Sequence, residues 1–305
     1  MVNTIFIISM LIARDKYISE ELVMIINTLE ESLNRCWNTK LLRKFSEGDY
    51  SVMNALHQEL LKLEIFPYLT SANLTDVAII NEVLGAKLLP GILASTIVAT
   101  RAINDKEILE GIYKGKIKVA ISDSNMVPAA DLADLIIIGK NFAWKEEVIL
   151  TSYESIDNSM RISKVEFKKS QPIEFNEEIA MLNLASQMVG GAEAVLNLSV
   201  EYAKNRIAFG KPIGSFQAVK HKLVDDAMII ELARSLYLKA SQNIKFAPLA
   251  KYYANKKLLK VMIDGIQVHG GIGFTDDVDV HLYFKRLITL GKLYYNYKPD
   301  ILNFL

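Results

Sequence analysis

The feature that most constrains the fold is a change in apolar spacing that happens twice along the chain. In residues 19–37, apolar side chains recur every three or four positions, as on one face of a helix. Between residues 116 and 167 the apolar residues instead form short β-branched or aliphatic runs separated by polar turns. A helical rhythm returns at residues 177–205. The pattern predicts a mostly α protein with a small β domain.

Helical patterns before the β region also cover residues 76–88, 91–103 and 105–114. Later patterns over 216–243 and 249–269, with a fourth helix capped by Thr275, predict a C-terminal four-helix bundle. We therefore expect a helical N-terminal domain (1–114), a reduced β middle domain (115–172) and a C-terminal helical bundle (173–305).

Charge and hydropathy exclude several classes of partner. The 305 residues contain 35 Lys and Arg and 35 Asp and Glu, so the formal net charge is zero. A chain without net positive charge is not attracted overall to nucleic acid or to an anionic membrane. The apolar run Ile5–Ala13 is shorter than the roughly 20 residues that a membrane span requires. It predicts a buried strand, or an extra start upstream of Met10, and we expect no membrane span.

The cysteine and histidine content argues against a metal site. Cys36 is the single cysteine, and the four histidines have no metal-ligand spacing relative to it. Without an intramolecular disulfide, a cytoplasmic location is expected.

One motif joins the end of a predicted helix to a glycine turn. Residues 202–213 read YAKNRIAFGKPI, and SFQAV follows at 215–219. Arg206 offers a planar donor suited to a diphosphate, and Gly210 permits close backbone approach. An ordinary helix end is the alternative, because cations and glycine both favour that position.

A second motif, GIQVHGGIGFT at residues 265–275, places an amide and unobstructed backbone at another helix end. Gln267, Gly270 and Gly271 could donate to phosphate oxygens, or could form a common helix-ending turn. His221 and His269 lie near these motifs, but each is expected to be a satisfied polar group. The pairs Asp225-Asp226 and Asp276-Asp277 are expected on solvent faces and caps.

With HLYFKR at 281–286, these motifs resemble the signature of the FAD-dependent acyl-CoA dehydrogenase family. The resemblance implies FAD as cofactor, oligomerisation through the bundle, and glycine contacts to the FAD of a neighbouring subunit. The implied cofactor-binding residues are Arg206, Phe209, Phe216, Gln217, Gln267, Gly270 and Gly271.

The chain departs from the family at the catalytic base, which is usually a glutamate. Counting from Arg286, one family position for that base falls on Tyr295, and the alternative position falls on Ala180. Glu177 lies one turn before Ala180 and could act as a shifted base, although a helix N-terminus also favours acidic residues. The β domain is also reduced, and the family's glycine loop is absent after Ser122. The catalytic residues are therefore left unassigned.

Three functions follow from the resemblance. The first is an oxidoreductase of fatty acid metabolism that oxidises an acyl-CoA thioester and passes electrons to an electron-transfer flavoprotein or equivalent acceptor. The second is a non-catalytic or half-catalytic subunit in a homo-oligomer or hetero-oligomer with a homologous subunit. The third is a flavin monooxygenase on the same scaffold, which needs no thioester base.

Overall fold

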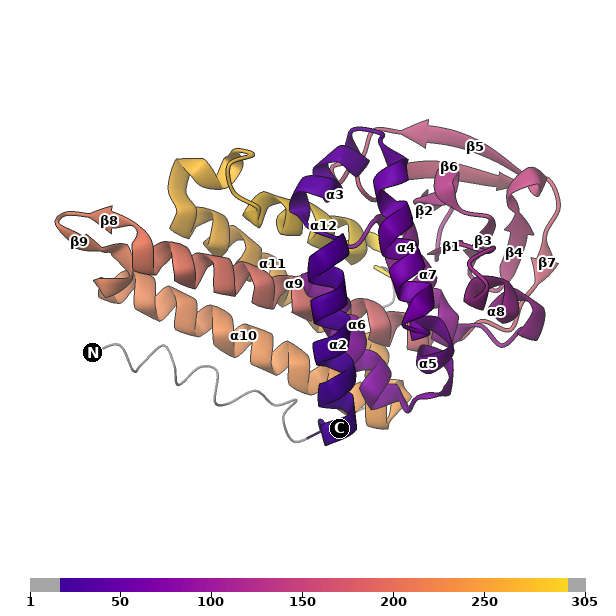
Figure 1. The fold of residues 1–305 in the computed structure, drawn as a ribbon, viewed down its shortest axis with the longest axis horizontal. Coiled ribbons are helices and arrows are strands. Elements are labelled where there is room, and N and C mark those ends of the chain that lie inside the picture. The colour runs from indigo at the N-terminus through magenta and orange to yellow at the C-terminus, as the bar shows by residue number, and fades with distance from the viewer. Residues whose placement is uncertain (1–16, 296–305) are drawn as a thin grey trace.

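The computed structural model describes residues 17–295 and contains the three expected parts in the expected order (Figure 1). The fold is mostly helical with a small β region. The predictions for Ile5–Ala13 and Met10 fall outside the described residues. The fold class predicted from apolar spacing is confirmed.

The N-terminal part is a layer of helices that packs against both the sheets and the bundle (Figure 1). Ser19 caps the first helix by accepting a hydrogen bond from the Leu22 amide. The sequence analysis did not predict the two short helices α3 and α5. The helices are α2 (Glu20–Cys36), α3 (Thr39–Ser46), α4 (Met53–Lys62), α5 (Ile65–Ser71), α6 (Leu74–Ala86), α7 (Gly91–Ala102) and α8 (Lys106–Tyr113).

The β region forms two small sheets. One has the order β1-β3-β4-β7 with β1 and β3 parallel, and the other is antiparallel with the order β2-β6-β5. Strand β1 is buried along its whole length, and Thr96 and Ser95 of α7 accept hydrogen bonds from its amides. The strands are β1 (Val119–Ser122), β2 (Met126–Pro128), β3 (Leu135–Ile138), β4 (Asn141–Trp144), β5 (Val148–Tyr153), β6 (Ile162–Phe167) and β7 (Gln171–Pro172).

The C-terminal part contains four helices, α9 (Glu177–Asn205), α10 (Gln217–Gln242), α11 (Ala247–His269) and α12 (Val280–Lys292). A hairpin of β8 (Ile207–Ala208) and β9 (Lys211–Pro212) connects α9 to α10 at the end farthest from the sheets (Figure 1). The predicted cap of the last helix is wrong. Helix α12 begins at Val280, and the Thr275 hydroxyl instead donates to the Ile272 carbonyl in a turn before it.

Helix α9 forms the centre of the molecule. Within residues 17–295 it is the helix with the length and hydropathy to cross a membrane, but 83% of its apolar window is buried by the rest of the protein. A Cβ added at Gly190 would lie 1.8 Å from the Glu82 carbonyl of α6, and one added at Gly85 would lie 2.2 Å from the Gln187 carbonyl. Glycine at these positions lets the two backbones touch, so α9 acts as a core helix.

Candidate functional site

Arg206 lies at the C-terminal end of α9, where the chain turns into the β8–β9 hairpin. Its amide donates to the Tyr202 carbonyl, and its own carbonyl accepts from the Ile213 amide, both at 2.8 Å. The residue is exposed. The backbone thus fixes where the side chain begins while leaving the guanidinium at the surface.

Phe209 and Gly210 form the tip of this hairpin, both with positive φ, at 52° and 76°. Phe209 is 94% exposed, although its ring meets the ring of Phe216 edge to face at 6.2 Å. Lys211 lies 4.5 Å from the centre of the Phe216 ring. Gln217 is the first residue of α10 and is exposed. The tip therefore presents aromatic faces, an amide and a cation together.

Gln267 and Gly270 mark the end of α11. Gly270, with φ of 67°, donates its amide hydrogen to the Gln267 carbonyl. A Cβ added at Gly270 or Gly271 would meet nothing within 4 Å, whereas one at Gly273 would lie 2.7 Å from the Ile266 carbonyl. Internal packing therefore explains the glycine at 273, and leaves an open stretch of backbone at 270–271.

An aromatic stack joins the two motifs. Tyr202, one turn before Arg206, lies on the ring of His269 with centroids 4.4 Å apart. His269 also bonds through Nδ1 to the Gly265 carbonyl at 2.8 Å. His269 is thus a satisfied polar group, as expected from the sequence. The ring contact also brings the two helix ends close together. All seven residues predicted from the sequence to bind the cofactor lie on the segments that meet at this end of the bundle, which we call the bundle tip.

The two positions at which the family places its base lie at the other end. Ala180 is in the first turn of α9 and is fully buried, and Tyr295 follows α12 and is 45% exposed. The Tyr294 amide donates to Asp123 at 2.9 Å, so this segment lies against the end of β1. Since a helix rises about 1.5 Å per residue, Ala180 and Arg206 are separated by roughly 40 Å along α9.

Tyr295 borders a cleft of about 470 Å³ between the β region and α12, which we call the Tyr295 cleft. Its lining residues are Ser122, Ser124, Met126, Pro128, Glu154, Ser155, Ile156, Ile162, Ile288, Thr289, Lys292, Leu293 and Tyr295. Glu177 does not line the Tyr295 cleft. Burial, with the nearby charges of Glu178 and Asp123, raises the pKa of the Glu177 carboxyl.

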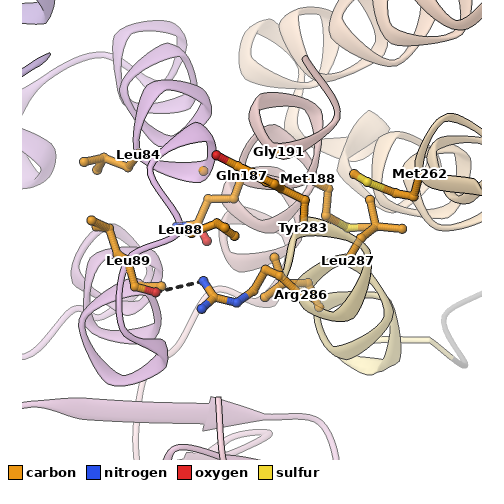
Figure 2. A pocket seen from close by; sticks show the side chains of 13 residues that line it. Leu84, Leu88, Leu89, Gln187, Met188, Gly191, Met262, Tyr283, Arg286 and Leu287 are labelled. Carbon is orange, nitrogen blue, oxygen red and sulfur yellow. Dashed lines mark hydrogen bonds between the residues drawn. The ribbon is translucent and has the colours of Figure 1, made fainter. Parts of the chain in front are cut away.

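Beneath the Tyr295 cleft, the space between α6, α9, α11 and α12 is almost filled (Figure 2). The cavity there holds about 10 Å³, and a second one beside Ser95, Pro128 and Leu290 holds the same. A volume near 10 Å³ corresponds to about one water molecule. These spaces are too small for an acyl chain.

Arg286 holds this filled region together. Its guanidinium donates to the Leu89 carbonyl at 2.8 Å (Figure 2). It also donates to Asp157 at 2.7 Å and to the Ser159 hydroxyl at 2.6 Å. The arginine and the aspartate are both buried. The sequence identified Arg286 as part of a motif but could not show that it joins α12 to the β5–β6 loop and the α6–α7 turn.

Two charged residues, Asp226 and Lys251, are buried although the sequence analysis did not predict it. Asp226 was expected on a solvent face, but it is 1% exposed, and burial together with Asp264 of α11 raises its pKa to about 7. The prediction was wrong because α11 packs against that face of α10. Lys251 is also buried and donates to the carbonyls of Leu290 and Leu293; burial lowers its pKa to about 7.

No group of three or more potential metal ligands occurs within residues 17–295. Two chemical features remain to be explained. The first is the set of polar and aromatic groups at the bundle tip, and the second is the lack of a carboxylate at both base positions.

These features and the helix, sheet, bundle order define an acyl-CoA dehydrogenase-like flavoprotein fold, and comparisons with known proteins agree. Residues 178–290 match the family model "Acyl-CoA dehydrogenase, C-terminal domain". The chain is 34% identical over 227 residues to "Acyl-CoA dehydrogenase IpdE2" of Mycobacterium tuberculosis, covering 70% of this chain and 71% of that protein. The chain belongs to the acyl-CoA dehydrogenase family.

Solved structures share the fold at low identity. Glutaryl-CoA dehydrogenase from Mycobacterium smegmatis superposes with a TM-score of 0.78 at 14% identity, over 95% of this chain and 96% of that one. The ChsE4-ChsE5 complex from Mycobacterium tuberculosis gives 0.76 at 16% identity, over 90% and 93%. The latter structure is a complex of two different proteins, which bears on the functional proposal below.

Proposed function

We propose that this chain is the base-lacking subunit of a hetero-oligomeric acyl-CoA dehydrogenase-type flavoprotein. In this proposal its bundle tip completes the FAD site of a homologous subunit, and that subunit supplies the catalytic carboxylate. The observation that carries the proposal is that Arg206 of the bundle tip and the base position Ala180 lie at opposite ends of α9, roughly 40 Å apart.

The residues at the bundle tip suit a dinucleotide. Arg206 would pair with the diphosphate, the open backbone at Gly270 and Gly271 would let phosphate oxygens approach closely, and Gln217 and Gln267 would bind polar groups of the FAD. The rings of Phe209 and Phe216 offer faces for stacking. The open backbone at 270–271 supports this fit, because no neighbour within the chain requires glycine there.

The same geometry supports a contribution in trans. The roughly 40 Å along α9 between Arg206 and Ala180 exceeds the length of a dinucleotide, so one FAD would not reach from the bundle tip to the base position at Ala180. A neighbouring subunit must supply the second half of such a site. The FAD, when bound, would supply hydride acceptance, and Arg206 would hold its phosphates in place.

The outer face of α10 offers a surface for that neighbour. Val224, Met228 and Leu232 follow one another at intervals of four residues and are 50–57% exposed. An apolar stripe of this kind on a helix that faces solvent marks a site of protein association. Its position on the bundle supports oligomerisation through α10.

A hetero-oligomer is favoured over a homo-oligomer by chemistry. In a homo-oligomer every cleft would have Tyr295 and Ala180 in place of the base, and general-base catalysis contributes about 10² to 10⁴ in rate. The assembly as a whole would dehydrogenate an acyl-CoA thioester and pass electrons to an electron-transfer flavoprotein or equivalent acceptor. We also propose the domain limits 1–114, 115–172 and 173–305, and a cytoplasmic location.

The test is co-expression with a full-length homologous subunit from the same organism. We expect flavin absorption and dehydrogenase activity only in the co-purified complex, and little of either in the isolated chain. Robust acyl-CoA turnover by the isolated chain, abolished by Glu177→Gln, would contradict the proposal and identify Glu177 as the base.

A further inference from the structure

The Tyr295 cleft has the size and lining of a small-molecule site. Its volume of about 470 Å³ falls within the range of roughly 300–1,000 Å³ typical of such sites. Six apolar side chains from the β region and α12 form most of its walls: Met126, Pro128, Ile156, Ile162, Ile288 and Leu293. Such walls favour an apolar ligand body.

Two ammonium groups gather at the α12 end of the cleft. Lys292 of α12 and Lys256 of α11 lie 5.1 Å and 5.5 Å from the centre of the Tyr295 ring. Both lysines are exposed. The family position that usually has a carboxylate therefore has a tyrosine flanked by two positive charges, so the local charge is reversed.

The acidic groups near the cleft lie elsewhere or are already bonded. Glu154 and Ser155, from the β5–β6 loop, line the cleft and also a neighbouring cleft at Arg161. Asp123 accepts the Tyr294 amide hydrogen at 2.9 Å and does not line the cleft. The buried Lys251 donates to backbone carbonyls below it. The α12 end is thus positively charged.

We propose that the Tyr295 cleft binds a small amphipathic molecule with a free carboxylate. The carboxylate would lie between Lys256 and Lys292, near the Thr289 hydroxyl, while the apolar body would lie along Ile288 and Met126. The inference goes beyond the proposed function, because it uses the end of the chain that is remote from the bundle tip.

The proposal can be tested on the full chain by isothermal titration calorimetry with dodecanoate below its critical micelle concentration. Dodecyltrimethylammonium, with the same tail and opposite charge, is the control for charge. Dodecanoyl-CoA is the control for a retained thioester site. We expect saturable binding of dodecanoate and much weaker binding of both controls.

Variants locate the site. Lys256→Ala and Lys292→Ala should each weaken dodecanoate binding about tenfold, as expected for one charge-assisted contact. Ser124→Trp should block the cleft, and because Ser124 is exposed the fold should tolerate it. Lys257→Ala, an exposed lysine one position along α11, is the matched control and should change nothing.

Three results would overturn the proposal: equal binding of the cationic amphiphile, binding of the CoA thioester in preference to the free acid, or dodecanoate affinity unchanged in both lysine variants. None of these results depends on flavin binding in the co-purified complex. The proposal for the Tyr295 cleft can therefore be wrong while the proposed function is right, and the reverse also holds.

Discussion

The bundle tip and the Tyr295 cleft lie at opposite ends of one helix and differ in what they keep of the family's chemistry. At the tip, Arg206, Gln267 and the open glycines retain the residue types of the family motifs. At the cleft, both base positions have lost the carboxylate, and the space beneath is filled around Arg286. In the proposed assembly, the chain keeps the half of a site that serves a neighbour and has lost the half that would serve itself.

The largest effect is expected from Arg286→Ala. It leaves Asp157 buried without its partner, and breaking a buried ion pair costs about 3–5 kcal/mol. Chemical denaturation should show this loss in the free energy of unfolding, and Lys285→Ala should serve as the nearly neutral neighbour. An unfolding free energy that does not change would mean that this clamp does not hold the β5–β6 loop in place.

At the bundle tip, Arg206→Ala should affect the cofactor and not the fold. Loss of one charge-assisted contact worth about 1.5–3 kcal/mol corresponds to roughly ten- to a hundredfold weaker FAD binding in the co-purified complex. Flavin titration measures the affinity, and circular dichroism checks helix content. Lys204→Ala, two residues earlier and paired on the surface with Glu201, is the control. Equal flavin occupancy in both variants would contradict the assignment of the tip.

A smaller, pH-dependent effect is expected within the bundle. Because the pKa of Asp226 is raised to about 7 in the folded protein, the folded state holds a proton that the unfolded chain has released. Its contribution to stability is therefore present below about pH 4 and is lost as the pH rises towards 7.

Asp226→Asn removes this titration while keeping a group that can donate to Asp264. The variant should match the parent near pH 4 and exceed its stability by roughly 1–2 kcal/mol at pH 8. Asp225→Asn, on the exposed side of α10, is the control. Thermal unfolding across that pH range provides the measurement. A constant difference between variant and parent at every pH would contradict the proposed titration.

The smallest effect is expected from restoring the base. Tyr295→Glu and Ala180→Glu should leave the isolated chain near background in acyl-CoA turnover, because in the proposed assembly a homologous subunit is needed to complete the FAD site. A gain approaching the 10² to 10⁴ expected of a positioned base would show that only the side chain was missing. The Tyr295 cleft would then differ from a working active site by a single residue.

Local signals predicted much of this structure. The apolar spacing gave the order of the three parts, and the limits predicted for α9 match those observed. Strands β2 and β7 were missed because they have only two or three residues and pair with strands distant in sequence, and the four-residue β4 was also missed. The cap at Thr275 was wrong because its hydroxyl bonds within the preceding turn.

The sequence likewise predicted some residues of the candidate site but not the contacts that bring them together. The motifs identified the residues of the bundle tip, but their meeting depends on the contact between Tyr202 and His269, which are 67 positions apart. Lys256 and Lys292 were missed because they converge on Tyr295 from different helices. The spacing of four residues between Tyr252 and Lys256 was the one local signal of that cluster.

The glycine contact between α6 and α9 has a mechanical consequence. Gly190 lies midway along α9, where its backbone touches α6 too closely for any side chain. Any residue larger than glycine at position 190 would therefore force α9 away from α6. Because the same helix has Glu177 at one end and leads into Arg206 at the other, one substitution at its middle would displace both ends at once.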